Sequence, residues 1–94
     1  MEAVTRRRLR PKWVTGLRPR LEAILRNGIS RGSLLGKGRI VSDMLEVTEL
    51  TLVNEPREME AKVEGKEVRF VYPLRGNESF DDVYYPLVRM LSNL

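Results

Sequence analysis

The chain has 94 residues, of which 41% are hydrophobic and 32% charged, which suffices for one small domain but not for two hydrophobic cores. It contains no cysteine and no histidine, so disulfides, thiolate metal sites and the commonest general base are all excluded. The net charge of +4 is unevenly distributed, because residues 1–40 carry eleven basic and two acidic residues and residues 41–94 carry six and eleven.

The N-terminal segment, residues 1–12, is predicted to be a disordered basic arm, and residues 13–94 a single folded domain. The arm contains "TRRRLRPK", which has too few apolar residues to fold alone. Its cations are suited to neutralise phosphates: Arg6, Arg7, Arg8, Arg10 and Lys12. Trp13 follows, either to stack on an exposed base or to anchor the first helix to the core.

Residues 15–28, "TGLRPRLEAILRNG", have the apolar spacing of a helix, with one stripe formed by Leu17, Leu21, Ile24 and Leu25. Gly28 is expected to end it, and Pro19 to lie in its first turn. Arg18 and Arg20 stand near the positive end of the helix dipole, which disfavours cations. Either a partner binds them, or Arg18 simply pairs with Glu22 at the i+4 position.

Residues 31–39, "RGSLLGKGR", look like a phosphate loop but do not match one. The first glycine is one place late for the pattern G-x-x-x-x-G-K-[ST], and Gly38 stands where Ser or Thr would hold magnesium. We therefore expect a pliable basic connector that presents Arg31, Lys37 and Arg39 to an anion.

Alternating apolar residues between positions 46 and 74 predict a three-stranded antiparallel meander. The Gly65-Lys66 turn pairs Val63 with Val68 and Ala61 with Phe70, so that their side chains share one face. A loop at "NEPR" pairs the preceding strand with the next one in the same way and sets Glu49 opposite Lys62. Residues 40–45, "IVSDML", fit either an extension of the first strand or a helical turn.

The last segment, "NESFDDVYYPLVRMLSNL", predicts a second helix. Ser79 and Asp82 have the spacing of a capping box, and the apolar side is formed by Val83, Leu87, Met90, Leu91 and Leu94. Because Pro86 lies seven residues after Ser79, we expect the helix to begin nearer Asp82.

The predicted fold is α+β, a small single domain with the order α-β-β-β-α and both helices on one face of the sheet. The other face would expose a small apolar strip of Val47, Thr51, Val53 and Val71, either as a dimer contact or as ordinary surface.

Few residues in the chain suit catalysis. Glu78, Asp81 and Asp82 form the only acidic cluster that could hold a divalent ion, and their position at a helix start indicates capping in preference to metal binding. We expect no enzyme, no catalytic residues, no metal and no cofactor.

The sequence favours a small non-enzymatic protein that associates with nucleic acid, RNA or DNA. The contacts would come from the basic arm, the first helix and the glycine-rich stretch. The alternative is a structural or assembly subunit, viral or from a multiprotein complex, which docks its basic half on an acidic protein partner and forms a homo-oligomer.

Composition also suggests a setting for the protein. No apolar run approaches the length of a membrane span, so no membrane partner is expected, and the absence of cysteine fits a cytoplasmic location. The excess of arginine over lysine, thirteen to four, suggests a thermophilic source.

Overall fold

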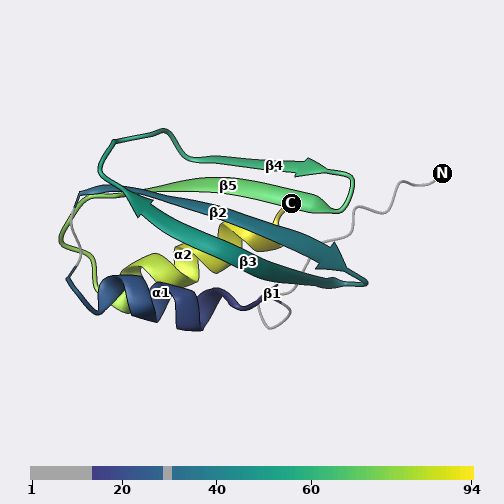
Figure 1. Cartoon of the computed structure of the whole chain (residues 1–94), viewed down its shortest axis with the longest axis horizontal. Coiled ribbons are helices and arrows are strands. Elements are labelled where there is room, and N and C mark those ends of the chain that lie inside the picture. Colours follow the sequence, from purple (N-terminus) through teal and green to yellow (C-terminus); the bar gives the residue numbers. More distant parts are fainter. Residues whose placement is uncertain (1–13, 29–30) are drawn as a thin grey trace.

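The computed structural model describes residues 14–28 and 31–94, which form a five-stranded mixed sheet and two helices (Figure 1). The elements in chain order are β1 (Val14–Thr15), α1 (Leu17–Leu25), β2 (Gly32–Val41), β3 (Met44–Val53), β4 (Glu60–Glu64), β5 (Glu67–Leu74) and α2 (Phe80–Ser92). The predicted arm and Trp13 lie outside the described residues. None of the helices in the described part of the chain is long and apolar enough to cross a membrane.

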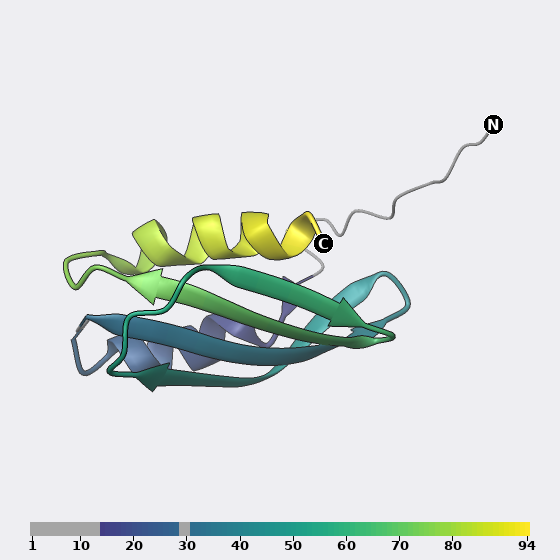
Figure 2. The ribbon, with the colours of Figure 1, turned by 90° about the horizontal axis from the view of Figure 1, so that it is seen from above.

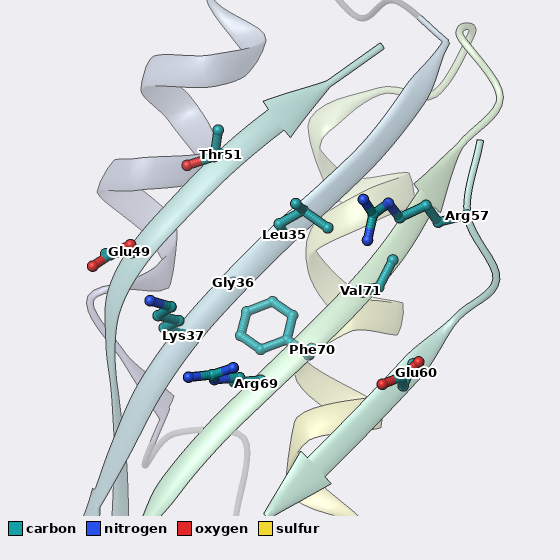
Figure 3. Close-up of a pocket in the computed structure, with 10 residues that line it drawn as sticks. All are labelled: Leu35, Gly36, Lys37, Glu49, Thr51, Arg57, Glu60, Arg69, Phe70 and Val71. Atoms are coloured by element: carbon teal, nitrogen blue, oxygen red, sulfur yellow. The ribbon is translucent and has the colours of Figure 1, made fainter. Parts of the chain in front are cut away.

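The strands lie in the order β1-β3-β2-β5-β4, with β1 parallel to β3 and every other pair antiparallel. Both helices cover the same face of this sheet, which we call the inner face, and leave the opposite, outer face uncovered (Figures 1 and 3). The α+β class and the common face of the helices are therefore as predicted, whereas the predicted order lacks β1 and β2.

The hydrophobic core lies between the inner face and the helices. Leu17 and Leu21 of α1 and Leu87 and Leu91 of α2 are fully buried there, as their helical spacing predicts. The strands contribute Leu34, Leu45, Val47, Val68, Phe70 and Leu74.

The second half of the predicted meander is confirmed and the first half is wrong. In the β4 and β5 hairpin, Val63 pairs with Val68 and Ala61 with Phe70. Strand β3 does not pair with β4, because β2 and β5 lie between them. The 54–59 connector therefore crosses the sheet and is not the hairpin loop that "NEPR" suggested.

The glycine-rich stretch forms most of the central strand β2, which corrects the prediction of a connector. Gly36 and Gly38 lie at positions of β2 that face the core, where there is no room for a side chain. A Cβ at Gly36 would lie 2.0 Å from the Phe70 ring, and one at Gly38 would lie 2.9 Å from Leu45 Cδ1. The sequence therefore lacks apolar residues at these two inward-facing positions of the strand, because side chains of the neighbouring strands fill the space that they would occupy.

A register shift in β3 alters which of its residues face the core. Lys37 pairs with Glu49 but Gly38 pairs with Val47, so Thr48 is an extra, bulged residue. Val47 is consequently 1% exposed and packs in the core, which corrects its predicted place in the outer apolar strip. Thr51 and Val53, beyond the bulge, lie on the outer face as expected.

Residues 40–45 form the tight β2 and β3 hairpin and not a helical turn. Val41 pairs with Met44, and Ser42 in the loop takes a left-handed conformation with φ 56°.

Most of the predicted signals at the helix ends are found in the structure, and the start of α2 is the exception. Pro19 lies in the first turn of α1, and Gly28 follows that helix with φ 91°. Ser79 caps α2 in a reciprocal capping box with Asp82. The expected later start of α2 is wrong: the helix continues through Pro86, which is exposed, because the cap and the buried apolar side outweigh the one backbone hydrogen bond that proline removes.

Candidate functional site

The outer face of the sheet carries a hollow of about 390 Å³ at its centre (Figure 3). Four strands and the 54–59 connector line it, through Leu35, Gly36, Lys37, Glu49, Thr51, Arg57, Glu60, Arg69, Phe70 and Val71. No described helix covers this surface, so side chains that alternate away from the core are available to a partner.

Two cations lie directly opposite each other in this hollow. Lys37 of β2 pairs in register with Arg69 of β5, and Lys62 of β4 pairs with Arg69 on its other side. Glu49 faces Lys37 from β3 in register, yet neither Lys37 nor Arg69 makes an ion pair with any described residue. The result is a row of three cations across adjacent strands, of which only Lys62 is paired, with Glu60 at 3.8 Å.

An apolar row runs beside the cations. Leu35 of β2 lies between Thr51 of β3 and Val71 of β5, and both Leu35 and Val71 are half-buried. Arg57 approaches the hollow from the connector and pairs with Glu55 at 3.3 Å. The centre of the outer face is thus partly apolar and rimmed by charged side chains of both signs, Lys37, Arg57 and Arg69 with Glu49 and Glu60.

The connector is fastened to the sheet by Ser33 of β2. The fully buried Ser33 hydroxyl donates to the Glu55 carbonyl at 2.8 Å and accepts the Arg57 N–H at 2.9 Å. These two bonds hold the connector over one end of the outer face and set the position from which Arg57 reaches the hollow.

Beyond the row formed by Lys37, Arg69 and Lys62, at the next outward-facing positions along the strands, the outer face carries more carboxylates. Arg39 pairs in register with Glu46 on one side and Glu67 on the other, and Glu67 in turn faces Glu64. Arg39, predicted to contact an anion, therefore has a carboxylate on both neighbouring strands, whereas Lys37 has Glu49 on one side and Arg69 on the other.

The structure does not bring the predicted site residues together. Arg18 and Arg20 belong to α1 on the covered side of the sheet, whereas Lys37 projects from the outer face (Figure 3). Arg39, two residues further along β2, lies on the same face as Lys37. Arg18 lies over the rings of Phe80 and Tyr84, 5.0 and 4.6 Å from their centroids, and pairs with Glu22 at 3.8 Å.

Arg20 and Arg31 make contacts that differ from those of Arg18 and Lys37. Arg20 donates to the Gly16 carbonyl at 3.0 Å. Arg31 lies with Arg75 beside a separate hollow of about 520 Å³ at the end of the sheet.

The acidic cluster at the start of α2 has structural roles. Glu78 accepts backbone N–H groups of Arg75, Gly76 and Asn77 at 2.8, 2.9 and 3.2 Å. Slight burial would raise the pKa of Glu78, but these hydrogen bonds outweigh it and the pKa is lowered. The capping bonds with Ser79 lower the pKa of Asp82. Among residues 14–28 and 31–94, no group of three acidic side chains is arranged to hold a metal ion.

The net charge of the protein lies in its first 13 residues. These contain five cations and one acid, a net of +4, whereas residues 14–94 carry twelve of each and are neutral overall. The positive net charge is thus a property of residues 1–13, whereas the cations and acids of residues 14–94 balance one another.

Sequence reasoning missed Arg57, Lys62 and Arg69 as members of the candidate site. The predicted β4 and β5 register already set Lys62 opposite Arg69, so this part of the signal was present. Lys37 lies in a row with Lys62 and Arg69 only because residues 32–41 form strand β2. The glycines of this segment hid the apolar alternation from which a strand is predicted.

Comparison with known proteins gives no match: no protein family, no curated protein and no solved structure is significantly similar to this chain.

Proposed function

We propose that this chain is a non-enzymatic nucleic-acid-binding protein whose outer sheet face contacts the phosphate backbone. The observation that carries the proposal is the direct opposition of Lys37 and Arg69, neither of which forms an ion pair with a described residue, although Glu49 lies opposite Lys37. Like charges opposite each other on adjacent strands lower the stability of a sheet. A bound phosphate between the two side chains would offset this repulsion and accept charge-assisted hydrogen bonds from both.

The basic N-terminal segment supports the same function. Since residues 14–94 are neutral overall, long-range attraction of a polyanion depends on the cations of residues 1–13. We assign Arg6, Arg7, Arg8, Arg10 and Lys12 to sequence-independent phosphate contacts, with Trp13 available to stack on a base. The half-buried Leu35 and Val71 beside the cations offer an apolar surface for a sugar or base.

Fluorescence anisotropy with labelled single-stranded RNA, single-stranded DNA and duplex DNA tests the proposal. The variant Lys37→Glu/Arg69→Glu is compared with Arg26→Glu/Arg89→Glu, which makes the same charge change at two exposed positions, the C-cap of α1 and the last turn of α2. We expect the first variant to weaken binding at least tenfold and the second less than about threefold, with affinity falling steeply from 50 to 200 mM salt as about four or more phosphate contacts require.

Three outcomes would contradict this function. The first is the absence of binding by the intact chain at low salt. The second is an equal loss of affinity in the two double variants, and the third is an affinity that does not change with salt. Deleting residues 1–12 tests the arm separately, and we expect it to reduce the salt dependence together with the affinity.

The same face also suits the alternative of an assembly subunit, because Leu35, Thr51 and Val71 form an apolar centre with charges of both signs around it. In that case the occupant is an acidic protein surface. Loss of an acidic protein partner, and not of RNA or DNA, in Lys37→Glu/Arg69→Glu would favour the alternative.

A further inference from the structure

We infer that β4 is a self-association edge, through which two copies of this chain join their sheets in one antiparallel pair centred on Ala61. Strand β4 is the last strand on its side of the described sheet, and no described element covers it (Figures 1 and 2). The opposite edge strand, β1, has only two residues. This inference does not rest on nucleic-acid binding.

The backbone of β4 is ready to pair. Glu64 and Glu67 close the two-residue loop, and hydrogen-bonded and open pairs alternate away from such a loop. Ala61 and Val63 therefore turn their N–H and C=O groups away from β5, toward the empty side. The hairpin is also held in place, because the Ile40 N–H donates to the Lys66 carbonyl at 2.7 Å.

The apolar side chains along this edge are unusually exposed. Met59 is 59% exposed and Val63 is 43% exposed, two of the five large apolar side chains in the described residues that remain open to this extent. Val63 and Ala61 lie on the inner side of β4, and Met59 precedes the strand at the position that continues their alternation. Natural sheets protect an edge with proline, a bulge, inward-pointing charges, short strands or charged side chains such as lysine. Strand β4 is short and carries Lys62, but residues 59–63 contain no proline, no bulge and no inward-pointing charge.

Charge and apolar patterns select one register. A two-fold axis at Ala61 places Met59 opposite Val63 of the second copy, and Glu60 opposite Lys62 of that copy, each pair occurring twice. Since Lys62 Nζ already lies 3.8 Å from the Glu60 carboxylate within one strand, the four charges would alternate in sign around the axis.

Neighbouring registers are less favourable. An axis at Lys62 sets the two Lys62 side chains against each other and Glu60 against Glu64, which are all like-charge pairs. An axis at Val63 leaves Met59 without a strand partner. The paired segment ends at Met59, because the chain before it turns over the sheet, where Arg57 bonds to Ser33.

A charge-swap series tests this register in solution. Sedimentation equilibrium of the full chain should show a concentration-dependent dimer. Glu60→Lys and Lys62→Glu should each weaken it about tenfold or more, since each creates two like-charge contacts. The double variant Glu60→Lys/Lys62→Glu should restore dimerisation, and a mixture of the two single variants should form a heterodimer.

The matched control is Glu64→Lys, which makes the same charge change in the same strand but outside the paired segment, and which should leave the dimer intact. A single cysteine added to this cysteine-free chain reports the axis directly. Under oxidation, Ala61→Cys should cross-link and Val63→Cys should not, because only residues at the axis meet their own copy within disulfide range.

Several results would overturn the inference. One is a full chain that stays monomeric up to millimolar concentration, which would leave the edge to a strand of another protein. A second is a double variant that dimerises no better than the single variants. A third is cross-linking of Val63→Cys in place of Ala61→Cys. A dimer disrupted by Lys37→Glu/Arg69→Glu and not by the edge variants would also contradict it and would assign self-association to the outer face.

Discussion

Phe70 lies across Gly36 on the inner face of the sheet. Atoms of its ring occupy the space in which a side chain at Gly36 would begin, with Cζ 2.0 Å from an ideal Cβ position. The two residues are direct neighbours in the β2 and β5 register, and Phe70 is 2% exposed. The glycine in the centre of the sheet is therefore part of the packing of the core.

Gly36→Ala is expected to lower the free energy of unfolding by about 2 to 3 kcal/mol, because the ring of Phe70 cannot shift in a filled core without strain. Urea denaturation measures this change. Phe70→Leu should cost less in the Gly36→Ala background than in the natural chain, since the smaller side chain relieves the clash. Equal costs in the two backgrounds would show that the residues do not interact.

Ser33→Ala is expected to destabilise the protein by about 1 to 2 kcal/mol, because the Glu55 carbonyl and the Arg57 N–H both lose their partner. The matched control is Ser92→Ala, since the buried Ser92 hydroxyl has no hydrogen-bond partner among the described residues. The control should be neutral or slightly stabilising. Thermal unfolding of both variants tests the difference, and similar losses would contradict the anchoring role of Ser33.

Glu78→Gln is expected to change how the free energy of unfolding depends on pH. The pKa of Glu78 is lowered in the folded state, so its carboxylate stabilises the fold fully above the unfolded-state pKa of about 4.5, and this contribution is lost as pH falls through the folded-state pKa. The stability difference between the natural chain and Glu78→Gln should thus be largest near neutral pH and vanish in strong acid. Denaturation at a series of pH values measures it.

Arg18→Ala is expected to lower stability by about 0.5 to 1 kcal/mol, because the guanidinium lies over the Phe80 and Tyr84 rings and links α1 to α2. Arg18→Lys should retain part of this contribution. Arg20→Ala, which removes one exposed hydrogen bond to Gly16, should change stability less. Unfolding curves that rank Arg20→Ala as the more damaging variant would contradict the structural role of Arg18.

Local sequence determined those elements whose information lies within a few residues. The Ser79 and Asp82 capping box, the Gly65-Lys66 hairpin and the apolar stripe from Leu17 to Leu25 each appear where their spacing predicts. Caps, two-residue turns and helical stripes are short-range features, so one sequence suffices to recognise them. The basic character of residues 1–13 is likewise a property of the sequence alone.

Only the tertiary structure decided the place of β2 and the surface built around it. Gly36 and Gly38 carry no apolar signal, because the volume they leave is filled by Phe70 and Leu45 from other strands. The bulge at Thr48 turned Val47 inward, which strand alternation alone could not reveal. Lys37 and Arg69 are 32 positions apart in the sequence and became neighbours through long-range pairing, so the candidate site exists only in the folded sheet.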